Sequence, residues 1–467
     1  MGRNACRVLV FSAAATAVAG LVGCGSVKDS GFTDAATGDA GLDADESGEA
    51  TVVTQAVLFG GTVGEAVGDI DVVSMSASNT LIEAKKTDAS GNVTIKVVPG
   101  GSVTAIYKHT IDMGADLITW VGVKPGDTLN FSSRSAQAPQ GTPNTSLGSQ
   151  TFSWPTQGGV TQYIVSTSTT ANGAGSASTS LVMQENQLWN VNSPFGGTFF
   201  QVPRKDPQDV LFLALTGNML SHFNTRQNVT FSAGANVAIG GWAPAVAASV
   251  NMTGLPPEIT GVSGQFSTVL DGMTEHSFLQ GFNGQPTGGA FTGNFMWAPV
   301  GDRTLAYASF NRQNFQSIRL IDSLTSNAVS QTIASPTLPP WVQGQVAVST
   351  ALREATWFPV PTAASAHDGQ MLRVGWNHVV SAVNHPHAWH FILPPGQTSI
   401  TFPKLPAAFE DHLPAPQDGL NALQLRLFDI STAANYDAVR ALPSRNVMCL
   451  ECGLRSGDFQ RVVISGQ

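Results

Sequence analysis

The stretch KTDASGNVTIKVVPGGSVTAIY, Lys86 to Tyr107, decides the fold class. It holds two runs rich in β-branched residues, 92–98 and 102–107, and each run follows a turn sequence. Asp88 to Gly91 and Pro99 to Gly101 are such turns, because glycine supplies positive φ and an aspartate side chain accepts backbone hydrogen bonds. The pattern predicts two short strands, each entered through a hairpin turn.

Similar runs recur along the chain and are bounded by glycine, asparagine and proline clusters. They lie at 51–58, 160–166, 209–215, 227–231, 398–402 and 460–465. Short strands separated by turn residues are typical of sandwiches and barrels. Amphipathic helices are scarce, and the best short candidate is 434–441. The sequence therefore predicts an all-β chain of tandem β-sandwich domains.

Residues 51–135 form the first expected unit. Their T-D-x-x-G turn, Thr87 to Gly91, precedes a strand and a proline-glycine turn, and Lys124 to Asp127 adds a further tight turn. This pattern resembles the prealbumin-like, carboxypeptidase regulatory-like β-sandwich of bacterial surface proteins. The resemblance implies a spacer or binding module without catalytic residues.

A second sandwich is expected at 140–255, where Phe152 to Thr169 resembles the opening of a fibronectin-like sandwich. Tryptophans lie on related strand-like runs at 372–380 and 388–406. The C-terminal β region, 256–467, is accordingly expected to hold one or two more sandwich units. This order of parts resembles multidomain surface lipoproteins of myxobacteria.

The N-terminus predicts export. Arg3 and Arg7 precede the uncharged, mostly apolar run 8–23, the order of a signal peptide, predicted over 1–23. The run ends in Leu-Val-Gly-Cys, which resembles a bacterial lipobox. That resemblance implies cleavage before Cys24, lipidation of its thiol, and an outer-membrane or cell-surface location. A plain signal peptide with Cys24 incidental is the alternative.

Residues 24–50 are expected to form a disordered tether behind the lipidated cysteine. Between 25 and 50 there are seven acidic residues and the single Lys28, without a run of large apolar residues. Such a segment cannot bury enough surface to fold. We expect it to hold the folded body away from the membrane.

The charge of the body excludes some partners. The whole chain carries −9, of which the leader contributes +2 and the tether −6, leaving −5 for 51–467. No basic stripe for nucleic acid is therefore expected. Charged residues make up only 12%, while the chain holds 48 glycines. This composition favours an extracellular β-protein.

The candidate metal ligands lie in HVVSAVNHPHAWH, 378–390. On a strand, His385 and His387 share a face because side chains repeat every two residues, whereas His390 points the other way. Two imidazoles and a third ligand could hold zinc or copper. Pro386 instead favours a loop or strand edge, so the alternative is a solvated edge with incidental histidines.

Cys449 and Cys452 are the remaining cysteines of the mature chain, spaced as Cys-Leu-Glu-Cys. In an exported protein they are disulfide candidates, closing a very small loop. A zinc site shared with the histidines is the alternative.

No catalytic motif is recognisable, and Gly261 to Gly264 lacks the glycine spacing and helix of a nucleophile elbow. The sequence predicts a non-enzymatic, lipid-anchored envelope protein without a cofactor, acting as a binding or structural module. Expected partners are the membrane, through the anchor, and a surface protein or polysaccharide. The alternative is an extracellular metal- or carboxylate-dependent hydrolase with a cleft in the C-terminal region.

Overall fold

The computed structural model describes residues 47–57, 63–109, 113–133, 149–168, 178–183, 188–190, 208–230, 236–270, 274–312, 316–325, 328–334, 339–360, 367–380, 383–448 and 454–466. All of them belong to one compact unit, Glu46–Gln467. The predicted signal peptide, nearly the whole predicted tether, Cys24, Cys449 and Cys452 lie outside the described residues.

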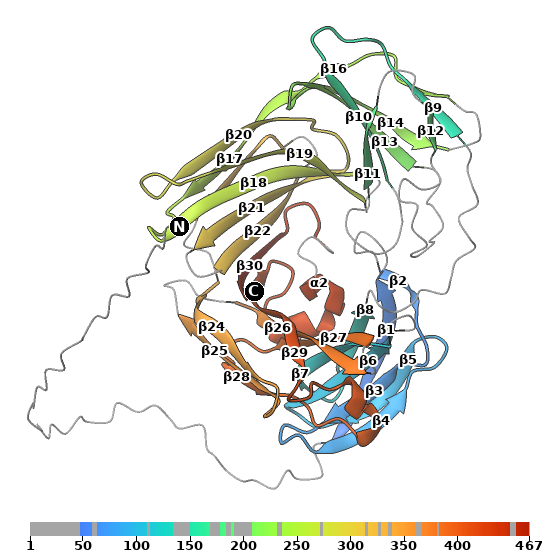
Figure 1. Ribbon diagram of the computed structural model, residues 1–467, viewed down its shortest axis with the longest axis vertical. Coiled ribbons are helices and arrows are strands. Elements are labelled where there is room, and N and C mark those ends of the chain that lie inside the picture. The colour runs from blue at the N-terminus through green and yellow to red at the C-terminus, as the bar shows by residue number, and fades with distance from the viewer. Residues whose placement is uncertain are drawn as a thin grey trace, which may run out of the picture. The chain divides into compact units, whose positions relative to one another are not determined.

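One long sheet forms the framework of this unit (Figure 1). Its strands are, in spatial order, β19 (Thr274–Gly284), β18 (Ile259–Leu270), β21 (Arg303–Arg312), β22 (Gln316–Thr325), β30 (Phe459–Gly466), β29 (Gly419–Ile430), β26 (Gly369–Val380), β27 (Val383–Leu393), β7 (Ala115–Val123), β6 (Gly101–Lys108), β3 (Asp71–Met75) and β4 (Leu81–Lys86).

Five smaller sheets complete the described architecture, and each is named here after one of its strands. The β1 sheet contains β2 (Val63–Ala66), β1 (Gly48–Val57), β5 (Asn92–Val97) and β8 (Thr128–Ser133), and the β10 sheet contains β11 (Ser178–Met183), β10 (Gln162–Ser168), β13 (Gln208–Thr216), β14 (Met219–Val229) and β16 (Ala243–Pro244).

Three sheets have three strands each. They are the β9 sheet with β12 (Leu188–Asn190), β9 (Ser149–Ser153) and β15 (Asn236–Ala238), the β17 sheet with β20 (Phe291–Trp297), β17 (Val246–Thr253) and β23 (Ser330–Ala334), and the β25 sheet with β24 (Trp341–Ser349), β25 (Glu354–Val360) and β28 (Ser399–Thr401).

The N-terminal strands form a sandwich. The β1 sheet packs face to face against β7, β6, β3 and β4, and alternate residues of both sheets fill the space between them. Val52 and Leu129 contribute from one sheet, and Val103 and Trp120 from the other, all fully buried. The period-two alternation in the sequence therefore produces the expected two-layered core.

The two decisive turns are present, but the prediction that they close hairpins is wrong. Asp88 Oδ1 accepts the backbone N–H groups of Ser90 and Asn92 at 2.8 and 2.9 Å, and Gly91 has φ +72°. However, β5 pairs with β1, while β4 and β6 both pair with β3. Each turn thus carries the chain across the core to the opposite sheet, because β5 buries its apolar residues by facing β6 rather than lying beside it.

The long sheet continues past the expected border near residue 135. β27 pairs in parallel with β7, with His387 opposite Ala115 and Ile392 opposite Trp120. Two short helices pack into the core of the N-terminal sandwich: α1 (Tyr436–Ala441) through Tyr436 and Val439, and α2 (Ser444–Met448) through Val447. The sandwich thus shares its sheet and core with C-terminal residues, and the domain borders stay predictions.

The remaining sheets build further sandwiches. The β9 and β10 sheets enclose a small separate core that includes Phe152, Trp154 and Phe212. The β17 and β25 sheets pack on the long sheet through one continuous core that contains Trp297 and Trp357. Trp154 and the five tryptophans among the largest fully buried side chains pack in the protein cores.

Two outcomes follow. The prediction of an all-β chain built from β-sandwiches is confirmed, and so is a helix within 434–441, where Asn435 caps α1 by accepting the N–H of Ala438 at 3.0 Å. Among the described residues there is no helix with the length and apolarity needed to cross a membrane.

Candidate functional site

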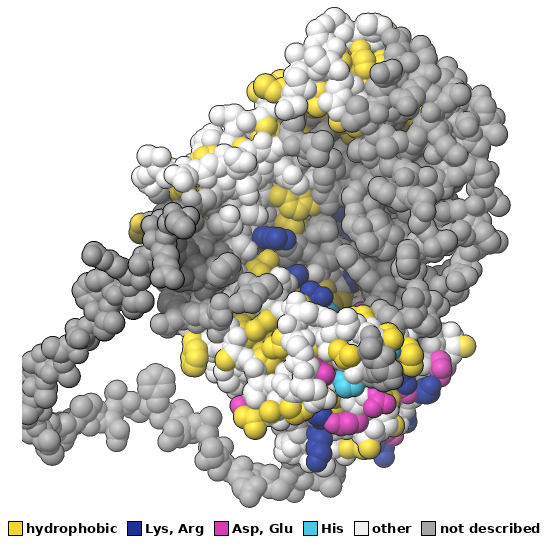
Figure 2. Space-filling model, viewed as in Figure 1, with side chains coloured by type: hydrophobic (Ala, Val, Ile, Leu, Met, Phe, Trp, Pro, Cys, Tyr) yellow, Lys and Arg dark blue, Asp and Glu magenta, His cyan; other side chains and the backbone are white. Residues whose placement is uncertain are grey.

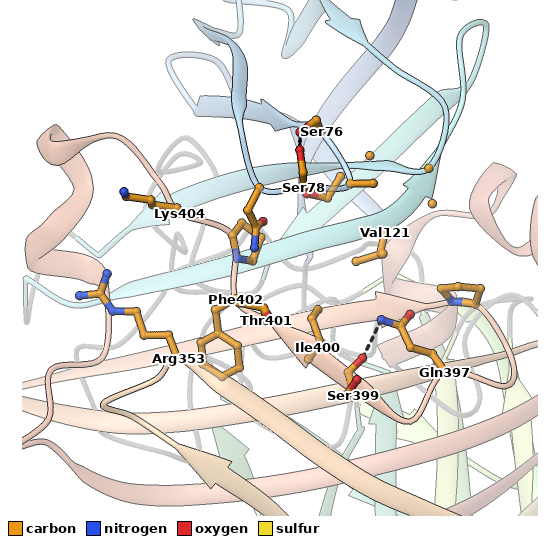
Figure 3. A pocket seen from close by; sticks show the side chains of 18 of the residues that line it. Ser76, Ser78, Val121, Arg353, Gln397, Ser399, Ile400, Thr401, Phe402 and Lys404 are labelled. Carbon is orange, nitrogen blue, oxygen red and sulfur yellow. Dashed lines mark hydrogen bonds between the residues drawn. The ribbon is translucent and has the colours of Figure 1, made fainter. Parts of the chain in front are cut away.

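A groove of about 1020 Å³ lies where the N-terminal sandwich meets the β25 sheet (Figure 3). Its lining residues come from segments far apart in the chain: 76–79, 100–102, 121–122, 352–353, 394, 397 and 399–404. Most of them follow or precede a strand, so strand ends and turns form the walls. The fold, and no local motif, assembles this site.

A buried glutamine fixes one wall. Gln370 of β26 is fully buried, and its Oε1 accepts the indole N–H of Trp357 at 2.8 Å. Its Nε2 donates to the carbonyl oxygens of Pro394 and Gln397 at 3.2 and 2.9 Å. Because these carbonyls belong to the turn between β27 and β28, Gln370 holds that turn in place beside β28. The Gln397 side chain in turn donates to the carbonyl oxygen of Ser399 at 2.8 Å.

Two turns of the N-terminal sandwich form the opposite wall. In the turn after β3, the hydroxyls of Ser76 and Ser78 lie 2.9 Å apart, and Ser76 Oγ accepts the N–H of Thr80 at 3.1 Å. Gly101 lies against this turn, and a Cβ there would overlap the carbonyl oxygen of Met75. Glycine at this position therefore permits the close approach of the two turns.

Two cations lie at one end of the groove. Arg353 has φ +51°, unusual for a residue with a side chain, and its guanidinium forms an ion pair with Glu410 and donates to the Pro414 carbonyl at 3.3 Å. Lys404 is exposed, and no carboxylate among the described residues forms an ion pair with it. Arg353 is thus compensated by Glu410, and Lys404 is the cation that offers this end of the groove a positive charge for an anionic group.

The side chains that line the groove determine which chemistry it could support. The described residues that line it are hydroxyl, amide, glycine, proline and apolar residues besides the two cations, and no carboxylate, histidine or cysteine is among them. Hydrolysis by paired carboxylates or by a histidine-activated nucleophile requires such groups. The described lining therefore does not supply the groups that these two hydrolytic mechanisms use. On the face in Figure 2, the acidic side chains of the described residues gather in the lower part of the view.

The structure corrects the sequence-based interpretation of the histidine region as a loop or solvated edge. β27 continues through Pro386 as a strand paired with β26, it lies between β26 and β7 from His387 onward, and His385 and His387 are 9% and 4% exposed. Proline is tolerated because the ladder to β7 begins only at the next residue, opposite Ala115, so the missing N–H is not needed there.

His387 lies in a cluster of rings. It stacks on Trp376 of β26, with ring centroids 5.5 Å apart and planes at 13°, and lies 5.6 Å from the ring of His412. His412 ends a short 3-10 helix, η4 (Ala407–His412). Burial, followed by the charge of His412, lowers the pKa of His387 to about 4, and burial also lowers the pKa of His412.

The other histidines of the stretch divide between the two faces of the sheet. His378 lies directly across from His385 and its Nδ1 is 3.0 Å from Asp418 Oδ1, whereas His390 lies on the opposite face, where its pKa is lowered to about 4 by burial. The Nδ1 atoms of His387, His390 and His412 are buried without a hydrogen-bond partner among the described residues.

Metal binding by His385 and His387 stays a prediction. Within the described ranges, no three histidine, cysteine, aspartate or glutamate side chains are grouped closely enough to hold a metal ion. Cys449 and Cys452 lie outside those ranges, so the disulfide prediction stays open too.

Sequence reasoning missed the groove. Two lining segments, Ser102 and 399–402, fall in runs that the sequence marks as strands, and nothing in the sequence relates these two runs to each other or to Ser76. Because the turns that form the groove come from separate segments of the chain, no characteristic spacing of residues in the sequence reveals it.

The comparisons with known proteins give no family. No family model and no curated protein matches the chain. Among solved structures, the Bacillus anthracis TIE protein aligns at TM-score 0.15 and 9% identity over 62% of this chain and 50% of its own, so the chain spans half of that protein. The major pilin subunit BcpA of Bacillus cereus aligns at TM-score 0.13 and 7% identity over 62% of this chain and 99% of the pilin. The chicken CNTN1 FN1-FN3 domains align at TM-score 0.13 and 11% identity over 58% of this chain and 84% of the CNTN1 chain. Scores this low support no argument about this chain.

Proposed function

We propose that this chain is an exported, lipid-anchored protein of the cell envelope whose β-sandwich body is a non-catalytic binding module, with the groove as its binding surface. One observation carries the proposal: the groove combines hydroxyl, amide and cationic side chains, and its described lining includes no carboxylate, histidine or cysteine. Polar groups converging in a preformed hollow are the usual basis of ligand recognition.

The partner is a surface polymer rather than a small molecule. Several turns and the edge strand β28 line the groove, which lies open along the boundary of two sandwiches (Figure 3). A site whose walls come from several separate segments can contact several units of a polymer at once. An envelope protein segment or an exopolysaccharide meets this description, in keeping with the cell-surface location that the sequence predicts.

The role of the groove in binding is tested by a substitution that fills it with a large side chain. Ser78 is exposed and lines the groove, whereas Thr80 is exposed in the same turn and does not line it. We expect Ser78→Trp to weaken binding of surface polymers at least tenfold and Thr80→Trp to leave it unchanged. Thermophoresis of the full chain against acidic and basic peptides and anionic and neutral polysaccharides measures this. Equal binding by both variants would remove the groove from the proposed function.

The anchor is tested at Cys24. If its thiol carries lipid, Cys24→Ser moves the chain from the detergent phase to the aqueous phase in a detergent partition experiment. Labelling with a radioactive fatty acid is lost in the same variant. A chain that partitions identically with and without Cys24 contradicts the anchor and leaves the groove proposal intact.

The hydrolase alternative belongs to the histidine cluster and not to the groove. Its specific support is the buried pair His387 and His412, whose Nδ1 atoms lack partners among the described residues. Metal content of the purified full chain decides it. A stoichiometric metal that is lost in His385→Ala/His387→Ala supports this alternative, and absence of metal contradicts its metal-dependent form.

A further inference from the structure

We propose that the groove takes an extended, acidic segment of a partner protein, which adds as an extra strand to the open edge of β28. The proposal rests on the proposed function and names the class of ligand for the same groove. Backbone pairing gives such a complex its affinity, and side-chain contacts give it its selectivity.

The hydrogen bonds of β28 show which backbone groups face the groove. On its inner side, the N–H of Phe402 donates to Arg353 at 2.7 Å and the N–H of Trp357 donates to Thr398 at 2.9 Å. In an antiparallel ladder, hydrogen-bonded pairs alternate with pairs whose N–H and C=O groups point outward. Ser399 and Thr401 occupy the alternate positions, so their backbone groups point away from β25.

That outer edge is open along the described chain. β28 is the last strand of its sheet, and no described strand pairs with its second edge. Gln397 covers the Ser399 carbonyl at 2.8 Å, but among the described residues no side chain covers the N–H groups of Ser399 and Thr401 or the Thr401 carbonyl in this way. An edge of this kind is a template for another strand.

The edge is held rigidly. Between the exposed Ser399 and Thr401, the Ile400 side chain is buried in the core, and Gln370 fixes the preceding turn through the Gln397 carbonyl. A preorganised edge loses little conformational entropy when a partner binds, so short pairings suffice.

Charge and shape favour an acidic peptide over a polysaccharide. Lys404 lies three residues beyond Thr401, exposed and without an ion pair to a described carboxylate, and Arg353 lies at the same end. Leu352, 66% exposed, offers an apolar contact for a partner side chain. The aromatic residue in the lining, Phe402, is buried, so its ring face is not open to stack on a sugar.

The first experiment selects ligands. Random linear twelve-residue peptides displayed on phage are selected on the full chain, with the Ser78→Trp variant used to remove peptides that bind elsewhere. We expect enriched sequences in which β-branched residues alternate with others and at least one Asp or Glu is present. Failure to enrich any sequence overturns the proposal.

The second experiment tests strand addition with matched variants. Thr401→Pro deletes one outward N–H without removing a bond to β25, and Thr401→Val keeps that N–H and changes only the side chain. We expect fluorescence anisotropy of a selected peptide to show about tenfold weaker binding for Thr401→Pro and Lys404→Glu, and unchanged binding for Thr401→Val. In an added strand, every second N–H group of the peptide donates to β28. Methylating the nitrogens of that set should abolish binding, and methylating the other set should leave binding unchanged.

The outcomes separate this proposal from the proposed function. Equal peptide binding by Thr401→Pro and Thr401→Val excludes strand addition. Binding of an anionic polysaccharide such as polygalacturonate, sensitive to Ser78→Trp but not to Thr401→Pro, overturns the peptide and leaves the groove as a binding site. If Ser78→Trp affects neither ligand, both proposals fail together.

Discussion

At the scale of single residues, buried polar side chains fix the positions of neighbouring segments through hydrogen bonds. Gln370 satisfies an indole N–H and two carbonyl groups at once, and Thr119 accepts the indole N–H of Trp389 at 2.7 Å while its hydroxyl lies 2.8 Å from that of Thr104. A buried polar group with a hydrogen-bond partner contributes little net free energy to folding. A donor or acceptor left in the core without its partner lowers the stability considerably. Substitutions at these residues therefore have larger effects than their size suggests.

We expect Gln370→Leu to lower the free energy of unfolding by about 2–4 kcal/mol, because it leaves Trp357 Nε1 and the carbonyl groups of Pro394 and Gln397 without their partner. Urea denaturation followed by tryptophan fluorescence measures this. Gln397→Ala is the matched control, since it removes one hydrogen bond near the surface and should cost less than about 1 kcal/mol. Equal effects of the two changes would contradict the role of Gln370 in the core.

The buried histidines predict loss of stability in acid. Their pKa values near 4 in the folded chain lie below the ordinary value of 6.5, so between these limits the unfolded chain binds more protons. The stability is complete above pH 6.5 and falls as the pH drops toward 4, by an amount on the order of 3 kcal/mol for each of His387 and His390. Thermal unfolding at pH 8 and pH 5 should show a smaller drop for His387→Gln than for the native chain. An identical drop would mean that His387 is not held neutral.

At the scale of elements, α1 is attached to the N-terminal sandwich by charge as well as by packing. Arg440, 3% exposed, pairs with Asp127 at 3.0 Å and with Asp437 at 2.9 Å, and the Tyr436 hydroxyl lies 2.8 Å from the carbonyl oxygens of Val121 and Ile392. Since Asp127 belongs to the tight turn at the end of β7, the C-terminal helix fixes a turn more than three hundred residues earlier.

We expect Arg440→Ala to destabilise the chain by about 2–3 kcal/mol, because it leaves the Asp127 carboxylate largely buried without its cation. Lys124→Ala is the control: its ion pair with Asp437 is exposed on both sides and should contribute less than about 1 kcal/mol. Denaturation midpoints of both variants check this. A larger effect of Lys124→Ala would reverse the ranking and exclude Arg440 as the main attachment.

At the scale of the whole body, the long sheet joins residues that the sequence places in separate domains. β7 pairs with β27, and the core of the N-terminal sandwich includes Tyr436 and Val439. Removing the C-terminal half would expose a strand edge and an apolar face together.

We therefore expect residues 46–135 expressed alone to lack a cooperative thermal transition, whereas residues 46–467 unfold cooperatively. Near-ultraviolet circular dichroism and calorimetry distinguish the two. A folded, cooperative fragment would instead establish the predicted domain border near residue 135.

The sequence by itself determined the strand-rich fold, because period-two alternation and turn residues such as Asp88 and Gly91 act within a few residues of each other. It also placed the helix near 434–441. Only the tertiary structure decided which strands pair, since β5 could have paired with β4 but buries its apolar face against β6. The groove was decided at the same level: Ser76, Arg353 and Lys404 line one groove because β27 pairs with β7, and pairing between residues hundreds of positions apart leaves no local pattern in the sequence.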